Sequence, residues 1–234
     1  MKFNICNLHS NIGNFIKRLQ RIVVYQTIHL NNCYRKALAA LFKVYYGQKL
    51  KQEDLKRIII NPLYKDTVTF VKTSAESDGK ISEMEITLLS GGKNPIHYHK
   101  SYSETFTAID GDLGLGLGKG KKKILKPGNA YTVDPNNLHY FFNSNNKEIK
   151  FKSVLEPGHE GFENSLRILY GMAADGMTDK NGIPKSIQHK AIVAIMADMN
   201  IPGFFTLISP LLKRIARKAK NSGVEQELID RYCK

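Results

Sequence analysis

Three histidines and one glutamate have the side-chain types and the spacing of a metal-binding site. His97 and His99 flank Tyr98 in a segment that reads as a β-strand, and Glu104 and His139 follow along the chain. Side chains at positions i and i+2 of a strand point the same way, so both imidazoles can reach one point in space. Three imidazole nitrogens and one carboxylate oxygen suit a first-row transition metal, whereas calcium and magnesium prefer oxygen ligands.

The spacing of these residues resembles the first motif of the cupin family. That motif is a glycine, five residues, His-x-His, three or four residues, a glutamate, six residues and a second glycine. Here the fixed positions are filled by Gly91, His97, His99, Glu104 and Gly111, with four residues between His99 and Glu104. Every fixed position of the motif is therefore present.

The second cupin motif is looser, and its spacings here differ slightly from the common pattern. Gly128, Pro135, His139 and Asn143 fill its positions. Asn137 stands where the turn glycine is usual, and asparagine tolerates the left-handed backbone conformation that such a turn needs. The resemblance covers about residues 60–160.

The resemblance to cupins implies a fold and a ligand set. The expected fold is mainly β, a double-stranded β-helix (jelly-roll) barrel with His97, His99, Glu104 and His139 as metal ligands inside it. The resemblance says little about the substrate, because cupins include dioxygenases, isomerases, decarboxylases, sugar-binding regulators and storage proteins. The four other histidines are interpreted as ordinary surface or core residues.

Changes in hydrophobic periodicity divide the chain into three parts. We predict a basic helical N-terminal extension over 1–56, the barrel over 57–160 and a C-terminal helical region over 161–234. Strands are predicted by alternation over 67–71, 81–89, 103–109, 114–118, 130–133, 139–143 and 149–155. Helices are predicted over 11–25, 32–46, 164–174, 186–199, 209–220 and 223–232, with Asn164, Ser186 and Ser209-Pro210 as start signals.

Apolar side chains are expected around the metal ligands. Phe106 and Phe141 share strand parity with Glu104 and His139, so they should line the same cavity, with Tyr131 and Met84 as neighbours. Such walls suit a small, partly aromatic or apolar substrate. The alternative is that these aromatic side chains are ordinary barrel core.

Three polar side chains near the motifs have open roles. Asn143 either supports a ligand or satisfies the end of a strand. Tyr98 and Tyr102 are the nearest candidate proton donors, although strand alternation points Tyr98 away from the metal.

The net charge of +14 is concentrated outside the predicted barrel. Residues 1–56 carry +8, residues 57–160 carry +2 and residues 161–234 carry +4. Basic flanks attract anionic surfaces, so peripheral membrane contact through basic amphipathic helices is one interpretation. Nucleic-acid binding is not favoured, because no zinc finger, RNP-like motif or clear helix-turn-helix is found.

The cysteine content and the absence of targeting signals indicate a cytoplasmic protein, and association with a membrane surface is the alternative. The three cysteines are distant from one another, which fits reduced thiols better than a disulfide framework. No secretory signal or apolar run of eighteen residues is found. We interpret the apolar segment 201–212 as a helical layer or a homodimer contact in preference to a hairpin in a membrane interface.

Two classes of function follow from these observations. The favoured one is a metal-dependent enzyme, a dioxygenase-like oxidoreductase that uses iron or manganese on a small organic molecule, although zinc, nickel and copper fit the same ligands. The second is a non-catalytic cupin that binds a metabolite or metal and uses its helical flanks for a partner or a membrane surface. A metal-assisted isomerase or lyase is a further alternative, because it needs only a Lewis acid.

Overall fold

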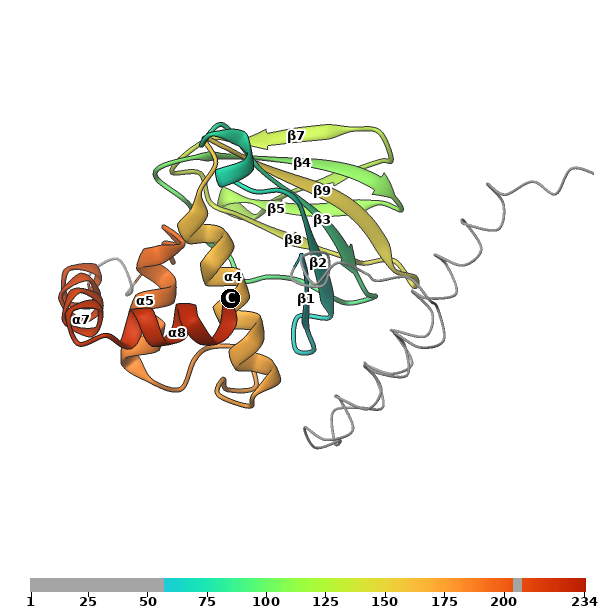
Figure 1. The fold of residues 1–234 in the computed structure, drawn as a ribbon. Helices are drawn as coiled ribbons and strands as arrows, with labels where there is room; N and C mark the ends of the chain where they lie inside the picture. The colour runs from blue at the N-terminus through green and yellow to red at the C-terminus, as the bar shows by residue number, and fades with distance from the viewer. Residues whose placement is uncertain (1–56, 204–207) are drawn as a thin grey trace, which may run out of the picture. The chain divides into compact units, whose positions relative to one another are not determined.

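The computed structural model describes residues 57–203 and 208–234. Within these ranges nine strands precede four α-helices, and the helices lie to one side of the strands (Figure 1). The mainly β class with helices after the strands is therefore confirmed. The two helices predicted in segment 1–56 lie outside the described residues.

The strands form two antiparallel sheets. Their bounds are β1 (Ile58–Asn61), β2 (Asp66–Lys72), β3 (Ser82–Leu88), β4 (Ser103–Asp110), β5 (Leu113–Leu117), β6 (Lys121–Leu125), β7 (Ala130–Val133), β8 (His139–Phe142) and β9 (Ile149–Glu156). The larger sheet has the order β1-β2-β3-β9-β4-β7 and the smaller one the order β6-β5-β8. The seven strands predicted by alternation are present, whereas β1 and β6 were not predicted, and the segment around His97 and His99, also read as a strand, forms only isolated bridges.

Strand β4 shows how alternation places one site residue. Glu104, Phe106 and Ala108 are buried, while the residues between them are partly exposed. Along the neighbouring strand β9, Glu104 lies opposite Leu155, and Phe106 lies opposite Ser153. Burying a side chain of the size of Phe106 contributes about 1.5–3 kcal/mol to stability, which fixes the register that brings Glu104 inward.

The glycines of β5 allow β8 to lie close beside it. Gly116 is the strand partner of Tyr140, and Leu117 is the partner of His139. A Cβ atom on residue 116 would lie 1.9 Å from the ring of Tyr140, so only glycine fits there. The glycine thus lets the strand that begins with His139 take its place in the smaller sheet.

The first helix, α4 (Glu160–Ala174), begins four residues before the predicted start at Asn164. His159 caps it instead, because its Nδ1 accepts a hydrogen bond from the backbone N–H of Phe162 at 2.9 Å. The backbone N–H of His159 also donates to Ser82 Oγ at 2.9 Å. A contact with a distant strand therefore sets this helix start, and local sequence cannot reveal it.

The other helices lie close to their predicted positions. They are α5 (Ile187–Met196), α7 (Ser209–Asn221) and α8 (Val224–Tyr232). Helix α5 ends three residues before the predicted end at Met199. None of the helices in the described ranges has the length and apolarity that crossing a bilayer requires.

Two buried carboxyl groups join α4 to the strands. Glu163 Oε1 accepts hydrogen bonds from Ser82 Oγ at 2.5 Å and from the backbone N–H of Ser74 at 2.6 Å. Tyr170 Oη donates to Asp66 Oδ2 at 2.6 Å. Burial raises the pKa of Asp66 to about 7, although the bond from Tyr170 opposes this shift. The last strand and α4 belong to one compact unit, residues 53–234.

Candidate metal centre

The structure brings the four predicted ligand residues together. His97, His99, Glu104 and His139 are 3%, 2%, 6% and 1% exposed. One nitrogen of each histidine and one carboxylate oxygen all lie within 4.8 Å of one another. Residues separated by up to 42 positions in sequence thus form one buried cluster that could hold a metal ion.

Backbone pairing between two segments aligns the histidines. The N–H of His97 donates to the carbonyl of His139 at 3.0 Å, and the N–H of His139 returns a bond of 2.9 Å. The segment around His97 and His99 makes isolated bridges in place of the predicted regular strand. Their ring centroids are nevertheless 4.7 Å apart, so the expectation that the two side chains lie on one side is confirmed.

Backbone carbonyls hold two imidazoles in one tautomer. His97 Nδ1 lies 2.8 Å from the carbonyl oxygen of Pro95, and His139 Nδ1 lies 2.9 Å from that of Asn137. A carbonyl only accepts hydrogen bonds, so each Nδ1 carries the proton. In a neutral imidazole this leaves the lone pair on Nε2, which is the arrangement that a metal ligand requires.

The two carboxylate oxygens of Glu104 have different partners. Oε1 accepts a hydrogen bond from Ser153 Oγ at 2.5 Å. Oε2 lies 3.2 Å from Nε2 of His139 and 3.7 Å from Nε2 of His99. Ser153 therefore fixes the carboxylate so that Oε2 faces the imidazoles.

When no metal is bound, the pKa values of the cluster residues shift in different directions. Burial, together with His139 and His99, lowers the pKa of His97 to about 3. Burial opposes ionisation of Glu104, but the bond from His139 and the charges of His139 and His99 lower its pKa to about 2. Burial also disfavours the charged form of His139, but Glu104 outweighs it and raises the pKa of His139. A metal cation would compete with the proton on His139 for the same carboxylate.

The donor atoms fit a divalent transition metal. Nε2 of His99 is buried and has no hydrogen-bond partner among the described residues. A buried polar atom without a partner is costly, so such an atom at the centre of a ligand cluster indicates a site built for a ligand. Three nitrogens and one oxygen favour iron, manganese, zinc, nickel or copper over calcium and magnesium, and they do not choose among the former.

The predicted wall residues lie at different distances from the cluster. Phe106 is 1% exposed, and its ring centroid lies 5.9 Å from that of His139. Phe141 is half-buried and packs on Phe106 at 6.3 Å. Tyr131 is half-buried beneath the ammonium group of Lys123, and Met84 is buried in the core on β3. Their roles in binding a substrate remain predictions.

Asn143 bonds to the loop around it. Its Nδ2 donates to the carbonyl oxygens of Leu88 at 3.0 Å and Lys147 at 2.8 Å, and its Oδ1 accepts from the N–H of Asn145 at 2.8 Å. These bonds correspond to the strand-end role that the sequence left open beside support of a ligand.

The turn before His139 corrects one detail of the second motif. The left-handed residue is Asn136, with φ of 66°, and not Asn137. The N–H of Asn137 closes the turn onto the carbonyl of Asp134 at 3.2 Å. The backbone carbonyl oxygen of Asn137 instead accepts the hydrogen bond from Nδ1 of His139. Asn136 thus supplies the left-handed turn conformation, and Asn137 orients the imidazole.

Several residues beside the cluster were not assigned a role next to a ligand from the sequence. Ser153 had a signal, since it is a polar residue at an inward position of the predicted strand 149–155. Tyr102, noted only as a proton-donor candidate, lies with its Oη 2.7 Å from His99 Nδ1. The carbonyl oxygen of Asp198 lies beside His99 Nδ1, and that of Ala197 accepts the hydrogen bond from Tyr102 Oη. Both residues lie about 100 positions away in sequence, and no local pattern predicts these contacts.

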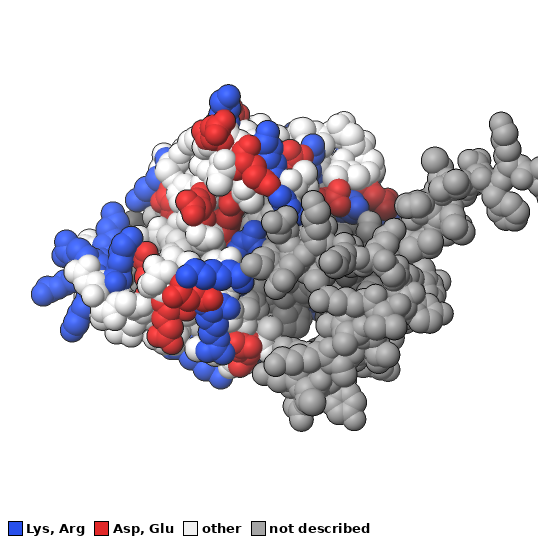
Figure 2. Space-filling view, viewed as in Figure 1, with Lys and Arg blue, Asp and Glu red and all other residues white. Residues whose placement is uncertain are grey.

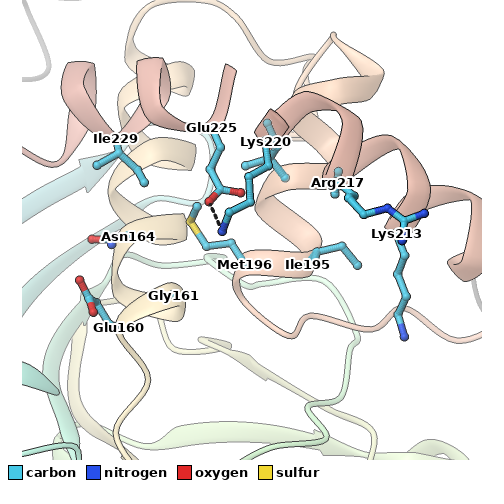
Figure 3. Close-up of a pocket in the computed structure, with 12 residues that line it drawn as sticks. Glu160, Gly161, Asn164, Ile195, Met196, Lys213, Arg217, Lys220, Glu225 and Ile229 are labelled. Carbon is cyan, nitrogen blue, oxygen red and sulfur yellow. Dashed lines mark ion pairs between the residues drawn. The ribbon is translucent and has the colours of Figure 1, made fainter. Parts of the chain in front are cut away.

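Two cavities in the described part of the chain lie away from the metal ligands. The larger one, about 620 Å³, lies between α4, α5, α7 and α8 (Figure 3). Ile195 and Met196 of α5 line it, together with Lys213 and Arg217 of α7. A second cavity of about 310 Å³ lies near Tyr64. Neither is lined by a residue of the cluster.

Comparison with known proteins identifies the family of the β region. The family model described as "Cupin domain" matches residues 84–155, which include all four ligand residues. Comparison with curated proteins gives no match.

Solved structures overlap with less than half of the chain. KdgF from Halomonas sp. has 15% identity and a TM-score of 0.38, with 43% of this chain and 86% of that chain covered. Ectoine synthase from P. lautus has 18% identity and a TM-score of 0.39, with 47% and 77% covered. A protein with a double-stranded beta-helix domain from Klebsiella pneumoniae has 22% identity and a TM-score of 0.38, with 47% and 91% covered. The match to the family model thus identifies residues 84–155 as a cupin domain.

Proposed function

We propose that this protein is a metal-dependent oxidoreductase of the dioxygenase type that acts on a small organic molecule. The observation that carries the proposal is the buried cluster of His97, His99, Glu104 and His139, whose donor atoms lie within 4.8 Å of one another. A redox-active divalent metal held by these residues would supply the electron-transfer and Lewis-acid chemistry that the protein's own side chains lack.

The surrounding residues would orient the reaction and exclude water. Carbonyl oxygens hold His97 and His139 as Nδ1–H tautomers, and Ser153 holds Glu104, so little reorganisation is needed when the metal binds. The ring of Phe106 beside His139 would shield one side of the centre from water. An apolar wall of this kind favours a small aromatic or aliphatic substrate over a sugar phosphate.

Metal analysis combined with oxygen uptake tests this proposal. Protein purified without added metal is expected to contain close to one iron or manganese ion per chain and to consume oxygen when a small aromatic or apolar compound is turned over. Saturable binding of such a compound without oxygen uptake would support the non-catalytic alternative. Metal-dependent turnover without oxygen uptake would support an isomerase or lyase.

A second candidate function, contact with an anionic membrane surface, is favoured by one helix. Helix α7 is strongly basic and carries no acidic residue, and Lys and Arg side chains gather at the left of the described part of the chain, where α7 lies (Figure 2). Leu211 belongs to the apolar segment 201–212, which the sequence analysis interpreted as a helical layer or a homodimer contact. The buried residues of α7 are Ala216 and Ala219, while Leu211 is 57% exposed. Exposed apolar and basic side chains on one helix are typical of contact with anionic lipids.

Reversing charges on α7 tests membrane contact. Because each basic residue near an anionic bilayer contributes about 1 kcal/mol, Arg214→Glu with Lys218→Glu should lower binding to phosphatidylserine-containing vesicles by about tenfold or more in sedimentation. The same charge change at Lys121 and Lys147, which are exposed in the β region, is the control and should weaken binding less. Equal binding to vesicles of phosphatidylcholine alone would exclude an electrostatic contact. A homodimer remains a separate prediction, checked by the molar mass in solution.

A further inference from the structure

A segment of the C-terminal region lies against the metal motif as an additional strand-like piece. The N–H of Tyr98 donates to the carbonyl of Asn200 at 2.9 Å, and the N–H of Asn200 donates back to the carbonyl of Tyr98 at 3.0 Å. Tyr98 lies between the ligands His97 and His99. Segment 197–200, directly after α5, is therefore fastened to the middle of the motif, although it lies outside the residues that the cupin family model matches.

The carboxylate of Asp198 holds the loop that follows His99. Its Oδ2 accepts hydrogen bonds from the backbone N–H groups of Lys100 at 2.7 Å and Ser101 at 2.8 Å, and from Ser101 Oγ at 2.7 Å. Its Oδ1 accepts from Asn200 Nδ2 at 3.0 Å. Three bonds to one oxygen fix the two residues that connect His99 to Tyr102.

A chain of hydrogen bonds runs from His99 to the same segment. Tyr102 Oη lies 2.7 Å from His99 Nδ1 and donates to the carbonyl oxygen of Ala197 at 2.8 Å. A hydroxyl has one proton, so if it is given to Ala197 the bond with His99 must be donated by Nδ1–H. The carbonyl oxygen of Asp198, 3.2 Å from Nδ1, also requires a proton there. The lone pair of His99 is thereby left on Nε2, the atom that has no partner among the described residues.

Packing supports the same arrangement. The rings of His99 and Tyr102 are stacked, with centroids 4.4 Å apart and an interplanar angle of 28°, and Tyr102 is 1% exposed. Phe162 of α4 meets His99 edge-on at 5.9 Å. The position, tilt and tautomer of His99 are thus set by residues of the C-terminal region as well as by the motif itself.

We propose that Tyr102 and Asp198 are positioning residues for the metal ligand His99, so that segment 197–200 is an integral part of the metal centre. Tyr102 selects the tautomer of His99, and Asp198 fixes the loop that carries Tyr102. This inference rests on the metal-binding function proposed above. It assigns a role to a region that the cupin motifs do not include.

Tyr102→Phe tests the hydroxyl alone, because the ring can keep its stacking on His99. Affinity for Mn²⁺, measured from the electron paramagnetic resonance signal of the free ion, is expected to fall about 10–100-fold, the usual effect of losing a partner of a metal ligand. Tyr140→Phe is the matched control, since that ring packs on Gly116 in the smaller sheet, and it should bind Mn²⁺ like the wild type. Unchanged affinity in Tyr102→Phe would overturn the proposal.

A readout without metal separates this inference from the proposed function. In metal-free protein, ¹⁵N NMR of the histidine rings should show His99 with its proton on Nδ1. In Tyr102→Phe a mixture with the Nε2–H form is expected, because one acceptor at Nδ1 is lost. If the wild type binds no Mn²⁺ but the tautomer of His99 still changes between wild type and Tyr102→Phe, the proposed metal-binding function fails and the positioning role stands. An unchanged tautomer in the variant would refute the positioning role.

Asp198→Ala tests the loop. It removes three hydrogen bonds to Lys100 and Ser101, so Mn²⁺ affinity should fall about tenfold. Asp198→Asn keeps one acceptor oxygen and should recover part of the loss. The control is Asp179→Ala, because Asp179 also accepts two backbone N–H bonds in a turn, from Asn181 and Ile183. An equal loss in the control, or wild-type affinity in Asp198→Ala, would contradict a role for this segment in the centre.

Discussion

Replacing His97 with alanine is expected to empty the metal site while the protein remains folded. His97 supplies one of four donor atoms, and losing a ligand should weaken binding by more than the roughly 10–100-fold that is typical when only an outer partner is removed. Burial keeps the pKa of His97 near 3, so the side chain is neutral at pH 7 and its removal leaves no unpaired charge. Metal content after purification and circular dichroism would be measured together.

The contrast with His139→Ala makes this prediction sharper. His139 Nε2 lies 3.2 Å from the buried carboxylate of Glu104, so its removal empties the site and also takes away the imidazole nearest to that charge. Breaking a buried pair in this way costs about 3–5 kcal/mol, so His139→Ala should unfold at a lower temperature than His97→Ala. His189→Ala, a histidine of α5 outside the cluster, should retain full metal content. Stoichiometric, tightly bound metal in either cluster variant would refute the ligand assignment.

The ligand set could be predicted from sequence because the information is local. His97, His99 and Glu104 lie within eight residues, and strand alternation alone places the two imidazoles on one side. His139 required the second motif, and the structure pairs it with His97 through two backbone bonds. The alternation on β4 likewise predicted that Phe106 would be buried, although it could not say how close the ring would lie to a ligand.

Tertiary contacts account for what could not be predicted. Asp198 lies 99 residues after His99, and no period or motif relates the two positions. Helix α4 begins at Glu160 and not at Asn164, because Ser82, a residue of a distant strand, fixes the backbone of the capping residue His159. The exposure of Leu211 could not be predicted, because helical periodicity cannot distinguish an apolar face that meets a neighbour from one left exposed. Each of these features depends on which surfaces meet after folding.

The buried carboxyl group of Asp66 leads to the last prediction, an inverse dependence of stability on pH. Asp66 is 3% exposed, Tyr170 donates to its Oδ2, and its Oδ1 has no partner among the described residues. Burial raises its pKa to about 7 in the folded state, against about 3.9 in an unfolded chain. Between these values the folded state holds a proton that the unfolded state has released, so stability falls as the pH rises.

Asp66→Asn should remove this pH-dependent cost. Below about pH 4 both states of the wild type are protonated, so the variant and the wild type should differ little. Above about pH 7 the full penalty applies, and a shift of about three pKa units corresponds to roughly 4 kcal/mol in favour of the variant. Urea unfolding of both proteins from pH 4 to 8 gives this difference, and because it compares two proteins at each pH, the titration of the histidine cluster cancels. Asp110→Asn, the same change at an exposed position, is the control. A difference between Asp66→Asn and wild type that stays constant across this range would show that burial does not raise the pKa of Asp66 in the folded state.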